Sequence, residues 1–347
     1  MHHTNPVTLM GAPGSPYTRK MLGALRFRRI PYQVSWQTRI GHDSESSMPT
    51  PKVPLLPTFY LPNEQGEIVA VTDSTPLLRR FEQDFVDRSI IPPDPVLSFI
   101  NWLIEDYADE WLTKAMFHYR WHYAADVKKA GSILPRWGHI SAPEADIEFL
   151  SQFISERQIS RLSYVGSNDV TKPVIESSFR RFLTLFSRCL QAGPFVLGKR
   201  PASADFALYG QLTCLALFDP TPSAIISEEF PRVYAWTELL EDLSGLEVTD
   251  EDWIDTRNGL PEELVALLSE IGHLYLPYLR ANAAAVHAGQ EILETQVDGQ
   301  VWTQTPFTYQ AKCLQWTLEA YQNLDPDTQN RLDQLLVGTN IVEQLRS

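Results

Sequence analysis

The sequence predicts an α/β domain followed by an all-α domain, and three observations support this prediction. Over roughly the first ninety residues, short strand-like and helical patterns alternate in the order β-α-β and then β-β-α. After the segment IIPPDP the chain changes to long helical patterns with apolar residues on one face. A chain of 347 residues is also too long for one ordinary core, so two domains and an extension are expected.

The elements of the first part can be assigned in order. A strand is expected at residues 7–10, and the turn GAPGSP leads into a helix over TRKMLGALRF. Residues 32–36 indicate a second strand. The segments PLLPTFYL and EIVAVT, separated by PNEQG, predict an antiparallel hairpin. A last helix, STPLLRRFEQDF, is expected to begin at Asp73 or Ser74, with Pro76 in its first turn.

The second part is predicted to be helical throughout. Its first helix is capped by Asp94 and has Pro95 at its first position. Further helices are expected at residues 172–191, 203–217 and 232–243, and glycines follow the first and last of them.

The C-terminal residues 259–347 also carry patterns of ordered structure. A long helix is expected from Pro261 through Ala285, and the Asp-Gly pair in ETQVDGQVWTQ indicates a hairpin. The segment TYQAKCLQWTLEAY is helical by its period, and Asp325 with Pro326 begins a last helix. The sequence leaves three roles open for this extension: covering a cleft, extending a dimer interface, or binding a partner.

Composition narrows the classes of partner. The net charge is −14 and no basic stripe compensates it, so nucleic acid is not an expected partner. No stretch has the apolar length that a bilayer requires, and MHHTNPVTLM lacks the features of a signal peptide, so a cytoplasmic protein without a membrane partner is expected. Cys189, Cys214 and Cys313 are widely spaced within apolar helical patterns, which favours buried thiols over a disulfide framework or metal site.

Four local stretches of the sequence, and a weaker fifth, match the motifs of one known family in the same order along the chain. SPYTRK is similar to the Ser-Pro-Phe/Tyr helix start of serine-type members, and KVPLLP to the segment with the cis-proline. Asp73-Ser74 is similar to the acidic residue and serine that open a helix, and GPFVLGKRPASADFALYGQL to the helical-domain signature; FPRVYAWTELL adds a weaker match. Together these stretches resemble the cytosolic glutathione transferase superfamily. The resemblance implies a thioredoxin-like domain at residues 1–91, an all-α domain at 96–258, and an atypical extension at 259–347.

Ser15 is the residue to which the resemblance gives a catalytic role. A helix that begins near Ser15 and Pro16 presents free N–H groups and a positive dipole end, which favour a thiolate. Because a thiol of pKa about 8.5 is mostly protonated at neutral pH, a hydroxyl donor there would increase the reactive fraction. Tyr17 and Thr18 are the alternative donors, and helix capping alone is the competing explanation of Ser15.

Other matched residues are implied to bind glutathione. Val53-Pro54 is expected to form the cis peptide, with the backbone of Val53 pairing with the cysteinyl part. Asp73 would pair with the γ-glutamyl ammonium, while Ser74 and nearby helix N–H groups take the γ-glutamyl carboxylate; plain helix capping is the alternative for this pair. The candidates for the glycyl carboxylate are charged residues of the preceding loop, namely Lys52, Arg39 and His42.

The stretch 101–123 is implied to line the pocket for an apolar electrophile. The candidate wall residues are Tyr107, Trp111, Phe117 and His118. Helix packing and a homodimer interface use the same residue types and are equally consistent with the pattern. Four acids of this stretch are expected on a solvated face: Glu105, Asp106, Asp109 and Glu110. No metal is expected, because His118 and His122 lack a further obvious ligand.

Two classes of function stay open at this point. The first is a glutathione transferase-like enzyme, in which Ser15 stabilises the glutathione thiolate for attack on an apolar electrophile, within a homodimer. The second is a non-catalytic binding or regulatory protein of the same fold. A disulfide reductase or lyase that uses bound glutathione is a further alternative. A dithiol mechanism is not expected, because the first domain contains no cysteine.

Overall fold

The computed structural model describes residues 6–36 and 48–347, and it begins with a four-stranded sheet of order β2-β1-β3-β4. β1 pairs in parallel with β2 and antiparallel with β3, which pairs antiparallel with β4. The strands are β1 (Val7–Met10), β2 (Tyr32–Ser35), β3 (Thr58–Pro62) and β4 (Ile68–Val71). α1 (Pro16–Phe27) connects β1 to β2, and α2 (Ser74–Asp84) follows β4. The predicted order of elements is therefore confirmed.

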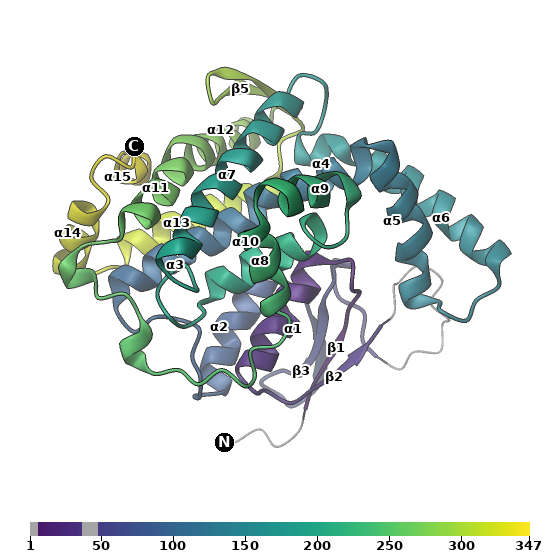
Figure 1. Cartoon of the computed structure of the whole chain (residues 1–347), viewed down its shortest axis with the longest axis horizontal. Coiled ribbons are helices and arrows are strands. Elements are labelled where there is room, and N and C mark those ends of the chain that lie inside the picture. The colour runs from purple at the N-terminus through teal and green to yellow at the C-terminus, as the bar shows by residue number, and fades with distance from the viewer. Residues whose placement is uncertain (1–5, 37–47) are drawn as a thin grey trace.

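α1 and α2 lie side by side against the sheet (Figure 1). Leu22 of α1 and Phe81 of α2 share one apolar core with Phe59 of β3, and the Phe59 and Phe81 ring centroids are 5.4 Å apart. The helical and strand periodicities in the sequence explain this core, because they place the apolar residues of each helix and strand on the face that is turned toward the core.

The chain then continues in helices. A long first helix consists of α3 (Pro95–Tyr107), the π-helical turn η1 (Ala108–Leu112) and α4 (Thr113–His122). The helices and short turns that follow are α5 (Ala124–Gly138), α6 (Glu144–Ile159), η2 (Leu162–Val165), α7 (Lys172–Ala192), α8 (Ser203–Leu215), α9 (Pro220–Glu229), α10 (Pro231–Leu239), η3 (Asp250–Asp252) and η4 (Thr256–Asn258). α5 and α6 form a hairpin that projects from the body (Figure 1), and the sequence patterns did not predict it.

The extension is ordered along its whole length. Its elements are α11 (Glu262–Glu270), the π-helical turn η5 (Ile271–Tyr275), α12 (Leu276–His287), β5 (Leu293–Val297), β6 (Gln300–Gln304), α13 (Thr308–Gln322), α14 (Pro326–Leu335) and α15 (Ile341–Arg346). The predicted hairpin is confirmed: β5 and β6 pair antiparallel, and Asp298 and Gly299 supply the positive φ angles of the turn. The single long helix predicted for residues 261–285 is interrupted by η5.

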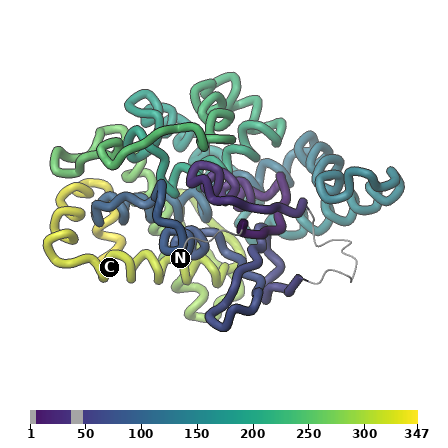
Figure 2. Tube along the Cα trace, turned by 90° about the horizontal axis from the view of Figure 1, so that it is seen from below, coloured from purple at the N-terminus to yellow at the C-terminus, as the bar shows by residue number. Residues whose placement is uncertain are grey.

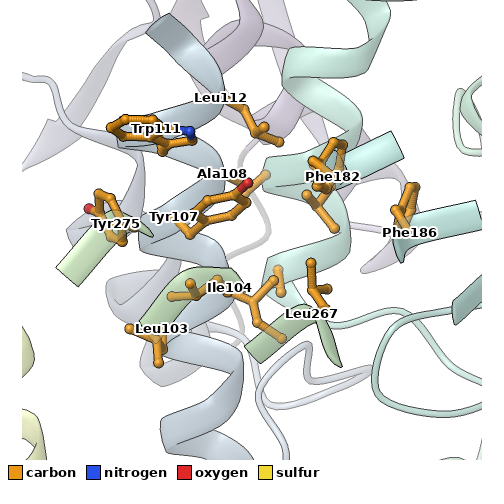
Figure 3. Packing of buried hydrophobic residues seen from close by; sticks show 14 of the residues in the cluster. Leu103, Ile104, Tyr107, Ala108, Trp111, Leu112, Phe182, Phe186, Leu267 and Tyr275 are labelled. Carbon is orange, nitrogen blue, oxygen red and sulfur yellow. The ribbon is translucent and has the colours of Figure 1, made fainter. Parts of the chain in front are cut away.

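One continuous apolar core joins the extension to the helices that precede it. Figure 3 shows Tyr107 of α3 between Phe182 of α7 and Tyr275 of η5, with ring centroids 6.2 Å and 5.7 Å apart respectively. The ring centroids of Trp111 and of Trp302 in β6 are 5.4 Å apart. The extension is thus an integral layer of the helical body, since it buries side chains of the same long helix that α7 covers.

Three simple properties complete the description of the fold. None of the helices in the described ranges combines the length and apolarity needed to cross a membrane. Within the same ranges, no group of three or more His, Cys, Asp or Glu side chains is placed to hold a metal ion. Cys189, Cys214 and Cys313 are free and buried, which confirms that they pack as small apolar side chains.

Candidate active site

The N-terminus of α1 is organised around the Ser15 hydroxyl. Ser15 is the N-cap residue, and its Oγ accepts a hydrogen bond from the backbone N–H of Thr18 at 3.2 Å. Pro16 follows at the first helical position, where its missing N–H has no cost. The same hydroxyl donates to the backbone C=O of Leu56 at 3.2 Å. Ser15 therefore caps the helix and also faces the loop that leads into β3.

The cis peptide in the described residues is Leu56–Pro57, so the prediction of a cis bond at Val53–Pro54 is wrong. Thr58 begins β3, which makes Pro57, the second proline of KVPLLP, the residue next to the strand. The Val53 C=O accepts the N–H of Leu55 at 2.9 Å, and the Val53 side chain is 53% exposed. The backbone of Leu56, rather than that of Val53, lies beside the tip of α1.

The two alternative hydroxyls point elsewhere. Tyr17 donates its phenol to the backbone C=O of Asp109 at 2.8 Å, and Thr113 Oγ1 lies 3.1 Å away. Thr18 is fully buried beneath the helix start. Ser15 and Tyr17 are both half-buried, but of the three candidate hydroxyls only that of Ser15 faces the Leu56 backbone at the tip of α1.

Close packing by the helical part fixes the position of this tip. A Cβ atom on Gly210 of α8 would lie 2.4 Å from the C=O of Pro16, so only glycine permits the approach of α8 to α1. Arg120 of α4 donates from Nη1 to the C=O of Gly14 at 2.9 Å, and its Nε contacts both carboxylate oxygens of Asp219 at 2.9 Å and 3.0 Å. Sequence reasoning missed Gly210 and Arg120, because no local motif marks either of them.

Asp73 and Ser74 lie at the start of α2, as predicted, but Asp73 has an unexpected partner. The phenol of Tyr309, in the extension, donates to Asp73 Oδ2 at 2.8 Å. Burial raises the pKa of Asp73, although the hydrogen bond from Tyr309 and the charge of Lys20 oppose the shift. The extension therefore reaches the very carboxylate that the family resemblance assigns to the γ-glutamyl ammonium.

The contacts to the glycyl carboxylate stay predictions. Lys52 is exposed, on the loop before β3. Arg39 and His42 lie outside the described residues.

The acids of α3 and η1 are largely buried, so the prediction of a solvated acidic face is wrong. Lys20 Nζ of α1 lies 2.7 Å from Glu105 Oε1 and 2.5 Å from Asp109 Oδ2. Glu105 also accepts from Arg79 Nη2 at 2.9 Å and from Ser203 Oγ at 2.6 Å. Burial acts to raise the pKa of Glu105, but Lys20 and Arg79 outweigh it and lower that pKa. This network ties α1 and α2 to the helical part.

The remaining two acids are covered by the extension. Asp106 Oδ2 accepts from the phenol of Tyr275 at 2.6 Å, and the amide of Gln310 donates to the backbone C=O of Glu110 at 3.2 Å. Burial raises the pKa of Asp106 to about 7 and that of Glu110 to about 8. Side chains of the extension thus take the place of water on this face.

The predicted electrophile-binding wall is not exposed in the structure. Tyr107 and His118 are 0% exposed and Trp111 is 2% exposed, while Phe117 is half-buried against Trp121. Helix packing, the alternative that the sequence left open, accounts for these side chains. Two cavities of about 400 Å³ and about 170 Å³ are lined by other residues, of the extension and of α2 and α3.

Lys114 is buried in α4 without a carboxylate in salt-bridge contact among the described residues. Its Nζ donates to the phenol oxygen of Tyr278 at 2.9 Å and to Gln304 Oε1 at 3.1 Å, and it lies 4.3 Å from the Tyr278 ring centroid. Burial lowers the pKa of Lys114 to about 7, against the attraction of Glu110.

Stability relative to a Lys114→Met variant is expected to rise with pH above 7. In the unfolded chain a lysine keeps its proton until pH about 10.4, whereas folded Lys114, with a pKa of about 7, releases it earlier. The wild type then gains up to about 1.4 kcal/mol of unfolding free energy per pH unit over the variant. Urea unfolding of both proteins at several pH values measures this difference in unfolding free energy. Asp106 and Glu110, whose raised pKa values act in the opposite direction, titrate in both proteins, so their contributions largely cancel in the difference. Parallel pH dependences would contradict the prediction.

The mixed four-stranded sheet with α1 and α2 against it, followed by the helical body, defines a thioredoxin-like domain joined to an all-α domain. The family model described as glutathione S-transferase, N-terminal domain, matches residues 9–89, and the model described as glutathione S-transferase, C-terminal domain, matches residues 157–247. The chain belongs to the glutathione S-transferase family, and this membership supports a glutathione-related enzyme activity. Neither model covers residues 90–156 or the extension.

Several solved structures are similar to this chain. A glutathione S-transferase from Methylobacterium radiotolerans, in complex with glutathione sulfonate, is 19% identical, with a TM-score of 0.41 over 68% of this chain and 91% of that chain. FzlA from C. crescentus is 17% identical, with a TM-score of 0.42 over 68% and 88%. A glutathione S-transferase from Rhodospirillum rubrum is 15% identical, with a TM-score of 0.42 over 88% and 99%. No curated protein matches the sequence at a significant level. The family assignment rests on the two family models.

Proposed function

We propose that this protein is a glutathione transferase-like enzyme in which Ser15 stabilises the thiolate of bound glutathione. The observation that carries the proposal is the position of the Ser15 hydroxyl, which is half-exposed at the N-terminus of α1 and bonded to Thr18 N–H and Leu56 C=O. A hydroxyl has one hydrogen to donate and two lone pairs. If it turns from Leu56 toward a sulfur, it donates to the thiolate while Oγ still accepts from Thr18.

The surrounding groups fit the rest of glutathione. The C=O of Leu56, once released by Ser15, is free to accept the N–H of the cysteinyl residue. The carboxylate of Asp73 suits the γ-glutamyl ammonium, while Ser74 and the N–H groups at the start of α2 suit its carboxylate. The bound thiolate attacks an electrophilic carbon of an apolar substrate, forms a C–S bond and expels the leaving group. The chain contributes a lowered thiol pKa and the orientation of the sulfur.

Replacing Ser15 by glycine is expected to lower kcat/KM for conjugation of an aryl halide by about ten- to a hundredfold, since a hydrogen bond to a charged sulfur is lost. Glycine is a tolerable N-cap, costing only a few tenths of a kcal/mol relative to serine, so the helix itself should persist. Calorimetric titration should still show glutathione binding to the variant.

Tyr17→Phe is the matched control for this experiment, because the Tyr17 phenol is turned toward Asp109 rather than toward the tip of α1. Its conjugation rate should stay near that of the wild type. Unchanged activity in Ser15→Gly would contradict the proposed role, and a loss confined to Tyr17→Phe would transfer that role to Tyr17.

A non-catalytic binding or regulatory protein is the second candidate function, and the contact between Tyr309 and Asp73 favours it. A side chain of the extension already bonds the carboxylate that glutathione would need, and the extension also covers much of α3 and η1. Failure of the wild type to bind glutathione at millimolar concentration would favour this candidate over the enzyme.

A further inference from the structure

Helix α13 of the extension contacts both the start of α2 and one face of α3. In Figure 2 the yellow C-terminal helices lie beside the blue segment that contains α3. At the start of α13, the phenol of Tyr309 donates to Asp73 Oδ2 at 2.8 Å. About two turns later, Thr317 Oγ1 accepts from the indole of Trp102 in α3 at 3.2 Å. The helix therefore lies across the edge of the proposed glutathione site.

The Tyr309 ring is held in place by its own neighbours. Its centroid lies 6.4 Å from that of Phe307 and 6.0 Å from that of Trp316. The backbone of Phe307 is fixed in turn by Asn282, whose side chain donates to the Phe307 C=O at 2.9 Å and accepts its N–H at 2.8 Å. The contact with Asp73 is thus made by a positioned side chain rather than by a free one.

We propose that Tyr309 is an internal occupant of the γ-glutamyl subsite, so that the extension closes this subsite until glutathione displaces it. The inference rests on the proposed function, which assigns Asp73 to the γ-glutamyl ammonium. An ammonium makes a stronger bond to a carboxylate than a phenol does, so the ligand is able to compete. Because linkage is reciprocal, glutathione loosens the start of α13 to the same extent that Tyr309 weakens glutathione binding.

Calorimetric titration of glutathione into four proteins tests this competition. The proteins are the wild type, Tyr309→Phe, Tyr309→Ala and the matched control Tyr321→Phe. Tyr321 also lies in α13 and donates to an aspartate, Asp333 Oδ1, at the same distance of 2.8 Å, but it is not at the site. Loss of one competing hydrogen bond in Tyr309→Phe is expected to lower Kd about two- to tenfold. Tyr309→Ala, which also removes the ring, should lower Kd at least as much, and Tyr321→Phe should leave it unchanged.

The outcomes separate this inference from the function on which it rests. If the wild type binds glutathione and the Tyr309 variants bind it equally or more weakly, the internal occupant is disproved while the proposed function stands. If none of the four proteins binds at millimolar glutathione, both fall together. Binding that occurs only in the two Tyr309 variants would support the inference in its strongest form.

Cys313 provides a second, independent measurement. It lies one turn after Tyr309 in α13 and is 3% exposed, and burial together with the carboxylate of Glu110 raises its pKa far above the usual value. S-methylglutathione keeps the γ-glutamyl group but has no thiol, so it does not consume a maleimide reagent. Its binding is expected to increase the maleimide labelling rate of Cys313 severalfold, as followed by mass spectrometry. The buried Cys189 and Cys214, outside α13, serve as internal standards. An unchanged labelling rate of Cys313 at a saturating concentration of S-methylglutathione would contradict the proposed displacement of α13.

Discussion

Replacement of Lys20 by methionine is expected to destabilise the protein by about 3–5 kcal/mol. The substitution leaves the buried carboxylates of Glu105 and Asp109 without the ammonium that lies 2.7 Å and 2.5 Å from them. Methionine keeps most of the apolar stem of the lysine, so lost packing is a minor part of the effect. Denaturant unfolding at neutral pH measures the change in free energy.

Two further variants test whether the effect comes from uncompensated charge. Lys128→Met, at an exposed position of α5, should change the free energy of unfolding by no more than about 0.5 kcal/mol. Glu105 keeps Arg79 Nη2 at 2.9 Å in the Lys20→Met variant, whereas Asp109 keeps no cation in salt-bridge contact among the described residues. Adding Asp109→Asn to Lys20→Met removes that unpaired carboxylate and should recover part of the loss. A loss of less than about 1 kcal/mol in Lys20→Met would show that this network does not join the two parts of the fold as strongly as its burial implies.

Replacement of Trp302 by alanine is expected to cost about 3–5 kcal/mol, the usual range for a buried tryptophan. Trp302 is 0% exposed, and its ring lies 5.4 Å from that of Trp111 and 5.6 Å from that of Tyr278. Its loss leaves a cavity between the extension and the long helix that carries η1. Thermal and denaturant unfolding measure the loss, and the labelling rate of Cys313 should rise as the extension loosens.

Val301→Ala is the matched control, since Val301 precedes Trp302 on β6 and is 58% exposed on the opposite side of the strand. This variant should stay within about 0.5 kcal/mol of the wild type. If Trp302→Ala were as stable as Val301→Ala, the shared core between the extension and the helical body would have to be reconsidered.

The extension has two roles that these variants can separate. Through Trp302 it completes the apolar core, and through Tyr309 it bonds a residue of the proposed site. A variant that loosens the core, such as Trp302→Ala, should therefore also bind glutathione more tightly, provided that the glutathione site itself stays folded. Tyr309→Phe should tighten glutathione binding with little loss of stability, because the Tyr309 side chain contacts the proposed site and is not part of the buried apolar core.

Features that depend on neighbouring residues were predictable from the sequence. The order of strands and helices around the sheet follows from periodicity and turn residues, and the hairpin at Asp298-Gly299 follows from its turn chemistry. Ser15 and Pro16 marked the start of α1 because an N-cap and a first-turn proline act within three residues. The N-terminal family match, residues 9–89, extends over most of the sheet and over α1, whereas neither family match reaches the hairpin.

The errors of sequence reasoning arose where distant residues decide the outcome. The segment KVPLLP contains two prolines, and only the position of β3 shows that Pro57 is the one beside the strand. The acids of α3 and η1 looked solvated because their partners, Lys20 and Tyr275, come from elements far away in the chain.

The sequence by itself determined the fold class, the helix start at Ser15 and the presence of an ordered extension. Local propensities and caps are properties of a few consecutive residues, so a single chain displays them directly. Only the tertiary structure decided what the extension does: it covers Asp106 and Glu110, encloses Trp111 and brings Tyr309 to Asp73 across 236 residues of sequence. A contact over such a separation depends on how whole helices pack, and no local pattern records it.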